Sequence, residues 1–129
     1  MIGNRLFINT DDTNYQVEEQ MAKTVRDCLD CQSMCLKTAT YCLSMSEKYP
    51  IRVILDCIEM CQVNVDFMLR GSKLRNNTSG LCGEACKKCE EFCKQFDNDF
   101  QMQACAESCR IASESCKIAA RLEAKVFLS

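Results

Sequence analysis

Hydrophobic residues recur along most of this chain every three or four positions, which is the spacing of amphipathic α-helices. No segment alternates convincingly as a β-strand would. Residues that favour helix ends divide the pattern into four long segments, which we predict to be helices. They span approximately residues 13–48, 50–71, 81–95 and 100–125. The pattern therefore predicts an all-α fold.

Helix-capping residues mark the first boundaries. Thr13 and Gln16 have the spacing of a capping box, which predicts a helix start. Pro50 suits the first turn of the next helix, and Gly71 suits its C-terminal cap. The polar run 72–80 is predicted to be the longest internal loop.

The last helix has its own cap candidates in Asp97, Asn98 and Asp99. Short connections between four long helices favour antiparallel neighbours. We therefore predict an antiparallel, up-down-up-down four-helix bundle with a cysteine-lined core. It forms a single domain over residues 1–129, in which residues 1–12 are an N-terminal extension.

The cysteines gather on one face of each predicted helix. At about 100° per residue, the members of each helix share a narrow arc. The four faces hold Cys28, Cys31, Cys35 and Cys42; Cys57 and Cys61; Cys82, Cys86, Cys89 and Cys93; and Cys105, Cys109 and Cys116. Aliphatic stripes flank these faces, for example Leu29, Leu36 and Leu43 on the first helix and Ile54, Ile58 and Val65 on the second. We therefore expect the cysteines to point at the bundle axis.

A weak internal repeat supports two related helical hairpins. The spacing Cys28-x-x-Cys31-x-x-x-Cys35 recurs as Cys86-x-x-Cys89-x-x-x-Cys93. In this alignment Phe100 stands at the position of Cys42. The second copy therefore lacks a potential thiolate at the position that Cys42 occupies in the first copy.

Composition narrows the class of protein. The 129 residues are 47% hydrophobic and 26% charged, as in folded globular proteins, and no apolar run is long enough for a membrane span. The net charge of -2 lacks the basic footprint needed for nucleic acid or anionic membranes. Because the N-terminal residues do not resemble a signal peptide, we expect a soluble, cytoplasmic protein with reduced thiols.

The chain contains 13 Cys, 7 Met and no His. Without histidine it lacks the Cys-His catalytic pair and imidazole metal ligands. We therefore expect no enzyme activity. The main enzymatic alternative is a thiol oxidoreductase, because Cys28-x-x-Cys31 and Cys86-x-x-Cys89 have redox-motif spacing, but the βαβ context of such motifs is missing.

Inward thiolates indicate a store for soft metal ions. Monovalent Cu(I) balances thiolates about one for one, so the core could hold on the order of 13 ions with bridging cysteines. Zinc in separate four-thiolate sites would number about three ions and leave excess negative charge. The cysteine runs also lack the loop spacing of iron-sulfur ligands. We predict Cu(I) storage through all 13 cysteines; a zinc or general soft-metal buffer, and a helical interaction module with a cysteine-packed core, are the alternatives.

These motifs resemble the cysteine-rich four-helix-bundle copper storage proteins of bacteria, over about residues 20–120. The resemblance rests on the two repeated runs, on the pairs Cys57/Cys61 and Cys105/Cys109, and on Cys116. It implies a lumen that holds many Cu(I) ions, a homotetramer, and either an exported or a cytosolic branch of the family. We expect the cytosolic branch, because the N-terminal residues do not resemble a signal peptide. Family members often place His or Met ligands near the open end, and this chain has no His.

Methionine is the other soft ligand. On a helical wheel Met21 and Met68 continue the cysteine faces toward one end of the bundle, whereas Met45 and Met102 lie nearer the other end. Either pair is a candidate guard of an entrance, but flexible core packing is the favoured interpretation. Asn64 shares the cysteine face of the second helix, and we expect it to hydrogen-bond rather than to donate a carbonyl ligand.

Overall fold

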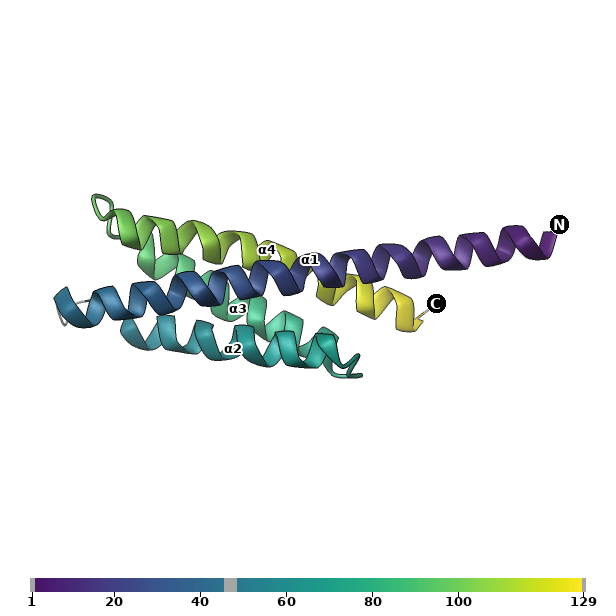
Figure 1. The fold of residues 1–129 in the computed structure, drawn as a ribbon, viewed down its shortest axis with the longest axis horizontal. Helices are drawn as coiled ribbons and strands as arrows, with labels where there is room; N and C mark the ends of the chain where they lie inside the picture. The colour runs from purple at the N-terminus through teal and green to yellow at the C-terminus, as the bar shows by residue number, and fades with distance from the viewer. Residues whose placement is uncertain (1, 46–48, 129) are drawn as a thin grey trace.

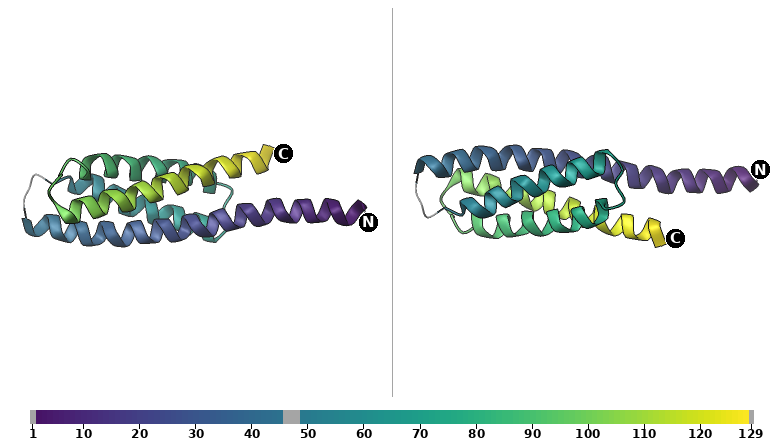
Figure 2. Two further views of the ribbon diagram at one scale, coloured as in Figure 1. Left: turned by 90° about the horizontal axis from the view of Figure 1, so that it is seen from above. Right: turned by 90° about the horizontal axis from the view of Figure 1, so that it is seen from below.

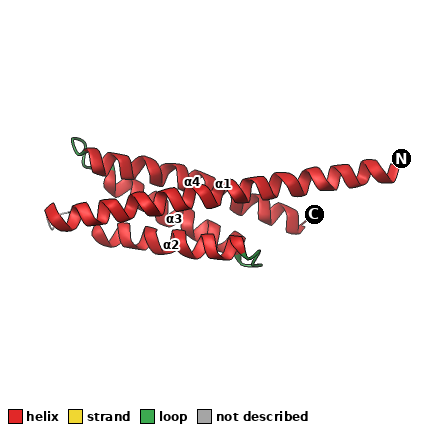
Figure 3. Ribbon diagram, viewed as in Figure 1, coloured by secondary structure: helices red, strands yellow, loops and turns green. Residues whose placement is uncertain are grey.

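The computed structural model describes the backbone of residues 2–45 and 49–128, and the side chains of residues 15–45 and 49–122. Four helices make up the fold, and the described residues contain no β-strand (Figures 1 and 3). They are α1 (Ile2–Met45), α2 (Ile51–Leu69), α3 (Arg75–Cys93) and α4 (Phe100–Leu128). This confirms the all-α prediction. None of these helices, over the described residues, carries the length of apolar sequence that crossing a bilayer requires.

The helices form an up-down-up-down bundle around one axis. Each helix contacts two neighbours, in the ring order α1, α2, α3, α4 and back to α1. Consecutive helices run in opposite directions, so both chain ends lie at the same end of the bundle (Figure 2). The N-terminal part of α1 projects beyond the other three helices.

The start of α1 differs from the prediction. The helix begins at Ile2 rather than Thr13, so the capping-box pattern lies inside a continuous helix. Residues 4–12 contain neither Pro nor Gly, and nothing in them interrupts a helical backbone. Residues 2–12 of the predicted N-terminal extension are therefore helical, while the single-domain organisation of residues 1–129 stays a prediction.

The third helix is also longer than predicted. It begins at Arg75 rather than Leu81, because the polar stretch that we predicted to be a loop is partly helical. Thr78 and Ser79 are buried in that first turn and donate hydrogen bonds to the Asn64 side chain. A tertiary contact therefore gives polar residues a place in the core that local sequence does not reveal.

Two predicted caps are confirmed. Gly71 has a φ of 64°, and the amides of Gly71 and Ser72 donate to the carbonyls of Met68 and Phe67, which is a Schellman motif. Asp99 caps α4, because its Oδ1 accepts the amide hydrogen of Met102 at 3.1 Å. Pro50, however, is the N-cap residue of α2 rather than its first helical residue.

Aliphatic packing follows the prediction on only one of the two helices. On α2, Ile54 and Val65 are buried, and Ile58 packs against the core. On α1 the stripe made of Leu29, Leu36 and Leu43 is 43%, 52% and 79% exposed, so this stripe does not flank the core inside the bundle as predicted. Cysteine and alanine fill the axis instead.

Two glycines offer a matched test of the helix boundaries. Gly71→Ala should lower the free energy of unfolding by about 1 kcal/mol, because alanine is strained at positive φ. Gly80→Ala should raise it by about 0.5–1 kcal/mol, because Gly80 lies inside α3 and an added Cβ would meet no atom within 4 Å. Guanidinium denaturation of the reduced protein measures both values. Destabilisation by Gly80→Ala would contradict the longer α3.

Candidate metal centre

The cysteines of all four helices meet along the bundle axis. All 13 are buried and all are free thiols, as the helical-wheel analysis predicted for their orientation. Twelve have no exposed surface, and Cys42 is 3% exposed. Spacing of three, four or seven residues keeps each set on one side of its helix. We call this arrangement the sulfur column.

Ten of the cysteines form groups whose Sγ atoms all lie within 4.8 Å of one another. The groups are Cys31, Cys35, Cys57 and Cys109; Cys31, Cys57, Cys61 and Cys86; Cys35, Cys89, Cys105 and Cys109; and Cys28, Cys61 and Cys82. A soft metal bound at about 2.3 Å from sulfur, as zinc is, joins two sulfur atoms up to about 4.6 Å apart. Since neighbouring groups share members, the sites they offer are linked rather than separate.

The remaining three cysteines extend the sulfur column at its ends. Cys116 lies 3.5 Å from Cys28, measured between Sγ atoms. Toward the other end, the Cys93 Sγ lies 4.0 Å from that of Cys89. The Cys42 Sγ lies 3.8 Å from the Met102 Sδ.

Thiol contacts control ionisation within the sulfur column. Hydrogen bonds from Cys116, Cys61 and Cys82 lower the pKa of the Cys28 thiol, and Asn64 adds to this effect against the opposing influence of burial. The contact with Cys28 in turn raises the pKa of Cys116. Neighbouring thiols therefore cannot all ionise unless a cation joins them.

The interior supplies no such cation of its own. Among the residues whose side chains are described, the buried polar ones are threonine, serine and asparagine, with no buried Lys, Arg, Asp or Glu. Buried thiolate charge in a low-dielectric core therefore has to be balanced by bound metal ions. This is the electrostatic condition that favours cationic, soft cargo.

A polar layer closes the sulfur column at the Cys28 end. The Asn64 Nδ2 donates to the Sγ atoms of Cys28 and Cys116, at 3.8 and 3.6 Å. Its Oδ1 accepts hydrogen bonds from Thr78 and Ser79, at 2.8 and 3.1 Å. The structure is thus consistent with the expected hydrogen-bonding role of Asn64, since both ends of its amide are occupied.

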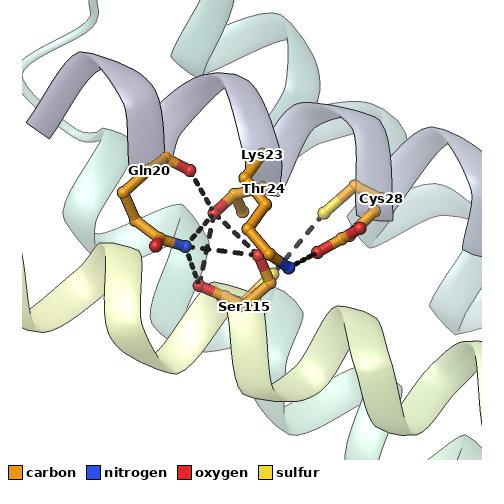
Figure 4. A network of polar contacts seen from close by, with 7 residues as sticks. Gln20, Lys23, Thr24, Cys28 and Ser115 are labelled. Atoms are coloured by element: carbon orange, nitrogen blue, oxygen red, sulfur yellow. Dashed lines mark hydrogen bonds and ion pairs between the residues drawn. The ribbon is translucent and has the colours of Figure 1, made fainter. Parts of the chain in front are cut away.

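A second set of polar residues lies beside this layer, between α1 and α4 (Figure 4). The hydroxyl oxygens of Thr24 and Ser115 lie 3.0 Å apart, and the Gln20 Nε2 donates to Thr24. The sequence analysis did not single out these residues, because apart from Asn64 it followed only the sulfur-bearing and aliphatic side chains on each helix face. Their signal in the sequence is a hydroxyl placed one turn beyond, or next to, a terminal cysteine.

The four methionine candidates differ in burial and in their contacts. Met21 and Met68 are buried with Val17 and Ala119 in a second apolar cluster. Met45 is 60% exposed, whereas Met102 is fully buried and contacts Cys42. The core-packing interpretation fits Met21 and Met68. Of the four methionines, Met102 is the one whose sulfur contacts a cysteine.

Comparison with known proteins then assigns the family. Residues 17–121 match the copper storage protein family, Csp. The chain belongs to this family. Copper storage proteins are a storage family and not a known enzyme family, and the buried cysteine groups of this member are possible sites for multiple Cu(I) ions.

Three solved structures are similar to this bundle. Apo copper storage protein 3 from Bacillus subtilis is 28% identical, with a TM-score of 0.72 over 77% of this chain and 97% of that chain. The Cu(I)-bound form of BsCsp3 is 28% identical and gives 0.74 over 78% and 98%. Nmul_A1745 from Nitrosospira multiformis is 31% identical and gives 0.75 over 81% and 98%.

The pKa of Cys42 predicts how stability depends on pH. Burial, with smaller effects of the charges on Cys105 and Asp99, raises this pKa from 9.0 to about 11. Between these values the unfolded chain loses the Cys42 proton while the folded chain keeps it, so this thiol lowers stability as pH rises. The slope of the free energy of unfolding against pH should therefore be less negative in Cys42→Ser than in the wild type, by up to about 1.4 kcal/mol per pH unit.

Anaerobic denaturation of the apo-protein from pH 9 to 11 measures this slope. Thr40→Ser, at an exposed position two residues away, is the control and should keep the wild-type slope. Equal slopes for Cys42→Ser and wild type would contradict the raised pKa.

Proposed function

We propose that this protein stores Cu(I) with all 13 cysteines as thiolate ligands, most of them bridging neighbouring ions. The overlap of the four thiol groups supports this proposal. Cys31 and Cys57 each belong to two groups, as do Cys35, Cys61 and Cys109. A cysteine that faces two potential metal positions is suited to bridge them. The sulfur column therefore favours a chain of ions over isolated centres.

The same overlap argues against zinc as the main cargo. Zinc prefers closed sites of four ligands that are not shared. Of the three groups with four cysteines, only two can be filled separately at once, namely the Cys31, Cys57, Cys61 and Cys86 group and the Cys35, Cys89, Cys105 and Cys109 group. Each would carry a charge of -2, and the described interior contains no Lys or Arg to offset it. Monovalent Cu(I) needs no such partner.

We propose storage without catalysis. The chain has no histidine, and the described buried residues include no carboxylate that could act as an acid or base. A cysteine-packed interaction module is less consistent with the interior, because Leu or Ile at these positions would bury more apolar surface than Cys does.

We further propose a cytoplasmic homotetramer. The free thiols suit a reducing compartment. The exposed stripe of Leu29, Leu36 and Leu43 repeats every seven residues along α1, and such an apolar stripe is suited to helix packing between subunits.

An anaerobic Cu(I) titration of the reduced protein against a chromophoric chelator tests the storage function. We expect saturation on the order of one ion per cysteine, because one monovalent ion balances each thiolate. Saturation at two Zn(II) per chain with little Cu(I) uptake would support the zinc buffer, and no tight binding of either metal would support the packing module.

Replacing four central ligands tests the sulfur column itself. The variant with Cys31, Cys35, Cys89 and Cys109 changed to Ser breaks all four-cysteine groups and should lose at least about a third of the Cu(I) capacity, because it removes four of the 13 thiolates, while staying helical. The control is Met21→Leu with Met68→Leu, which removes two buried sulfur atoms outside the sulfur column. Unchanged capacity in the cysteine variant would refute the assignment.

The proposed assembly has a separate test. Leu36→Glu places a charge in the exposed stripe and should convert a four-chain species into smaller ones, measured by light scattering after size-exclusion chromatography. Leu74→Glu, at a 56% exposed position outside the stripe, is the control. A wild-type mass of one chain would rule out the tetramer.

A further inference from the structure

We propose that Asp99, Tyr41 and Tyr49 form a latch over the Cys42 end of the sulfur column, and that its opening sets the rate at which Cu(I) enters and leaves. The inference rests on the proposed storage function. It identifies the Cys42 end as the one through which Cu(I) passes, and it assigns positioning roles to three residues that bind no metal.

The Cys28 end is closed in successive layers. Asn64 and its hydroxyl partners Thr78 and Ser79 come first, next to the pair of Thr24 and Ser115. All five have relative exposures between 0% and 8%. Figure 4 shows how the α1 and α4 members of this end face one another. Beyond them lies the apolar cluster of Val17, Met21, Met68 and Ala119. An ion leaving here would have to part buried hydrogen bonds and then cross an apolar layer.

The Cys42 end is closed differently. Cys42 is the one cysteine with any exposed surface, and its Sγ contacts the thioether sulfur of Met102. Met102 is held in turn by the Asp99 cap at its amide. No second buried cluster among the described residues covers this end. What covers it is a group of half-buried side chains: Tyr41 near the end of α1, Tyr49 just before α2, and Phe96 and Asp99 between α3 and α4.

Asp99 is the centre of that group. Its Oδ2 accepts hydrogen bonds from the hydroxyls of Tyr41 and Tyr49, both at 2.8 Å. Tyr49 stacks on Phe96 with ring centroids 4.9 Å apart, and its ring meets that of Tyr41 edge-on at 5.8 Å. One carboxylate between α3 and α4 thus joins Tyr41, in the last turns of α1, to Tyr49, next to the start of α2.

The latch can open at lower cost than the opposite end. Its members are half-buried, so water can replace the tyrosine hydroxyls at Asp99 when the connections separate. The buried hydroxyls and amide at the Cys28 end would be left without partners on opening. The most exposed thiol at this end is Cys42, whose Sγ contacts the Met102 Sδ at 3.8 Å.

Thiol labelling of the apo-protein tests the direction without any copper. Under anaerobic conditions N-ethylmaleimide should modify Cys42 before Cys28 and Cys116, as read by peptide mass spectrometry over time. The double variant Tyr41→Phe with Tyr49→Phe should label Cys42 about tenfold faster, because the loss of about 1.4 kcal/mol of hydrogen bonding is a tenfold change in the opening equilibrium. Labelling of Cys28 first in the wild type would overturn the proposal.

Copper transfer tests the rate. Cu(I)-loaded protein is mixed with a chromophoric chelator, and the variant lacking both tyrosine hydroxyls should release copper about tenfold faster at unchanged stoichiometry. The matched control is Thr24→Val with Ser115→Ala, which removes two hydroxyls at the opposite end and should leave the release rate unchanged. Melting temperatures of both variants are compared, so that global destabilisation does not imitate opening.

The outcomes separate the two proposals. Equal acceleration by the control variant at matched stability, or no acceleration by the tyrosine variant, would refute the latch while leaving storage intact. A protein that binds little Cu(I) but labels first at Cys42 would refute storage, and with it the role of the latch in copper transfer, while showing that the bundle opens at the Cys42 end. Faster release from the tyrosine variant alone, with full capacity, supports both.

Discussion

The constraint on which this structure depends is the mutual repulsion of buried thiolates, which prevents neighbouring thiols from ionising together. Sulfur atoms from four helices lie 3.5 to 4.0 Å apart in an interior whose described buried residues include no charged side chain. In the apo-protein one thiolate can be stabilised by neighbouring S–H donors, as at Cys28, only while its partners stay protonated. Every further ionisation requires a cation inside the bundle. The arrangement that lets the apo-protein fold as neutral thiols is therefore the same one that draws monovalent soft metal ions into it.

A core made of small sulfur side chains has a packing consequence. Cysteine and alanine bury less apolar area than leucine, so the axis contributes less hydrophobic stabilisation than an ordinary bundle core. Small residues also let helices approach closely, as where Gly83 of α3 lies against Cys116 and Ser113 of α4. Larger side chains are placed elsewhere: Ile54, Val65, the Tyr41, Tyr49 and Phe96 rings, and the exposed leucine stripe of α1.

The two ends of the sulfur column are closed by chemically different side chains. The two related helical hairpins therefore form a column whose ends are not equivalent. Hydroxyl and amide groups close one end, where each buried polar atom needs its partner. A carboxylate and aromatic rings close the other, where partners are exchangeable with water. The sequence repeat does not extend to this level, because α3 ends at Cys93 and Phe100, which aligns with Cys42, is 95% exposed.

Local sequence determined the helices, the antiparallel order and the inward orientation of all 13 cysteines, because helical periodicity and caps such as Gly71 and Asp99 act over a few residues. It did not determine the start of α3, where buried contacts to Asn64 override a polar composition. Nor did it show that Leu29, Leu36 and Leu43 face outward, since a wheel places residues on a face but not relative to the neighbouring helices. Which thiols share a group, and how each end is closed, depend on contacts between residues far apart in the chain. Only the tertiary structure brings those residues together.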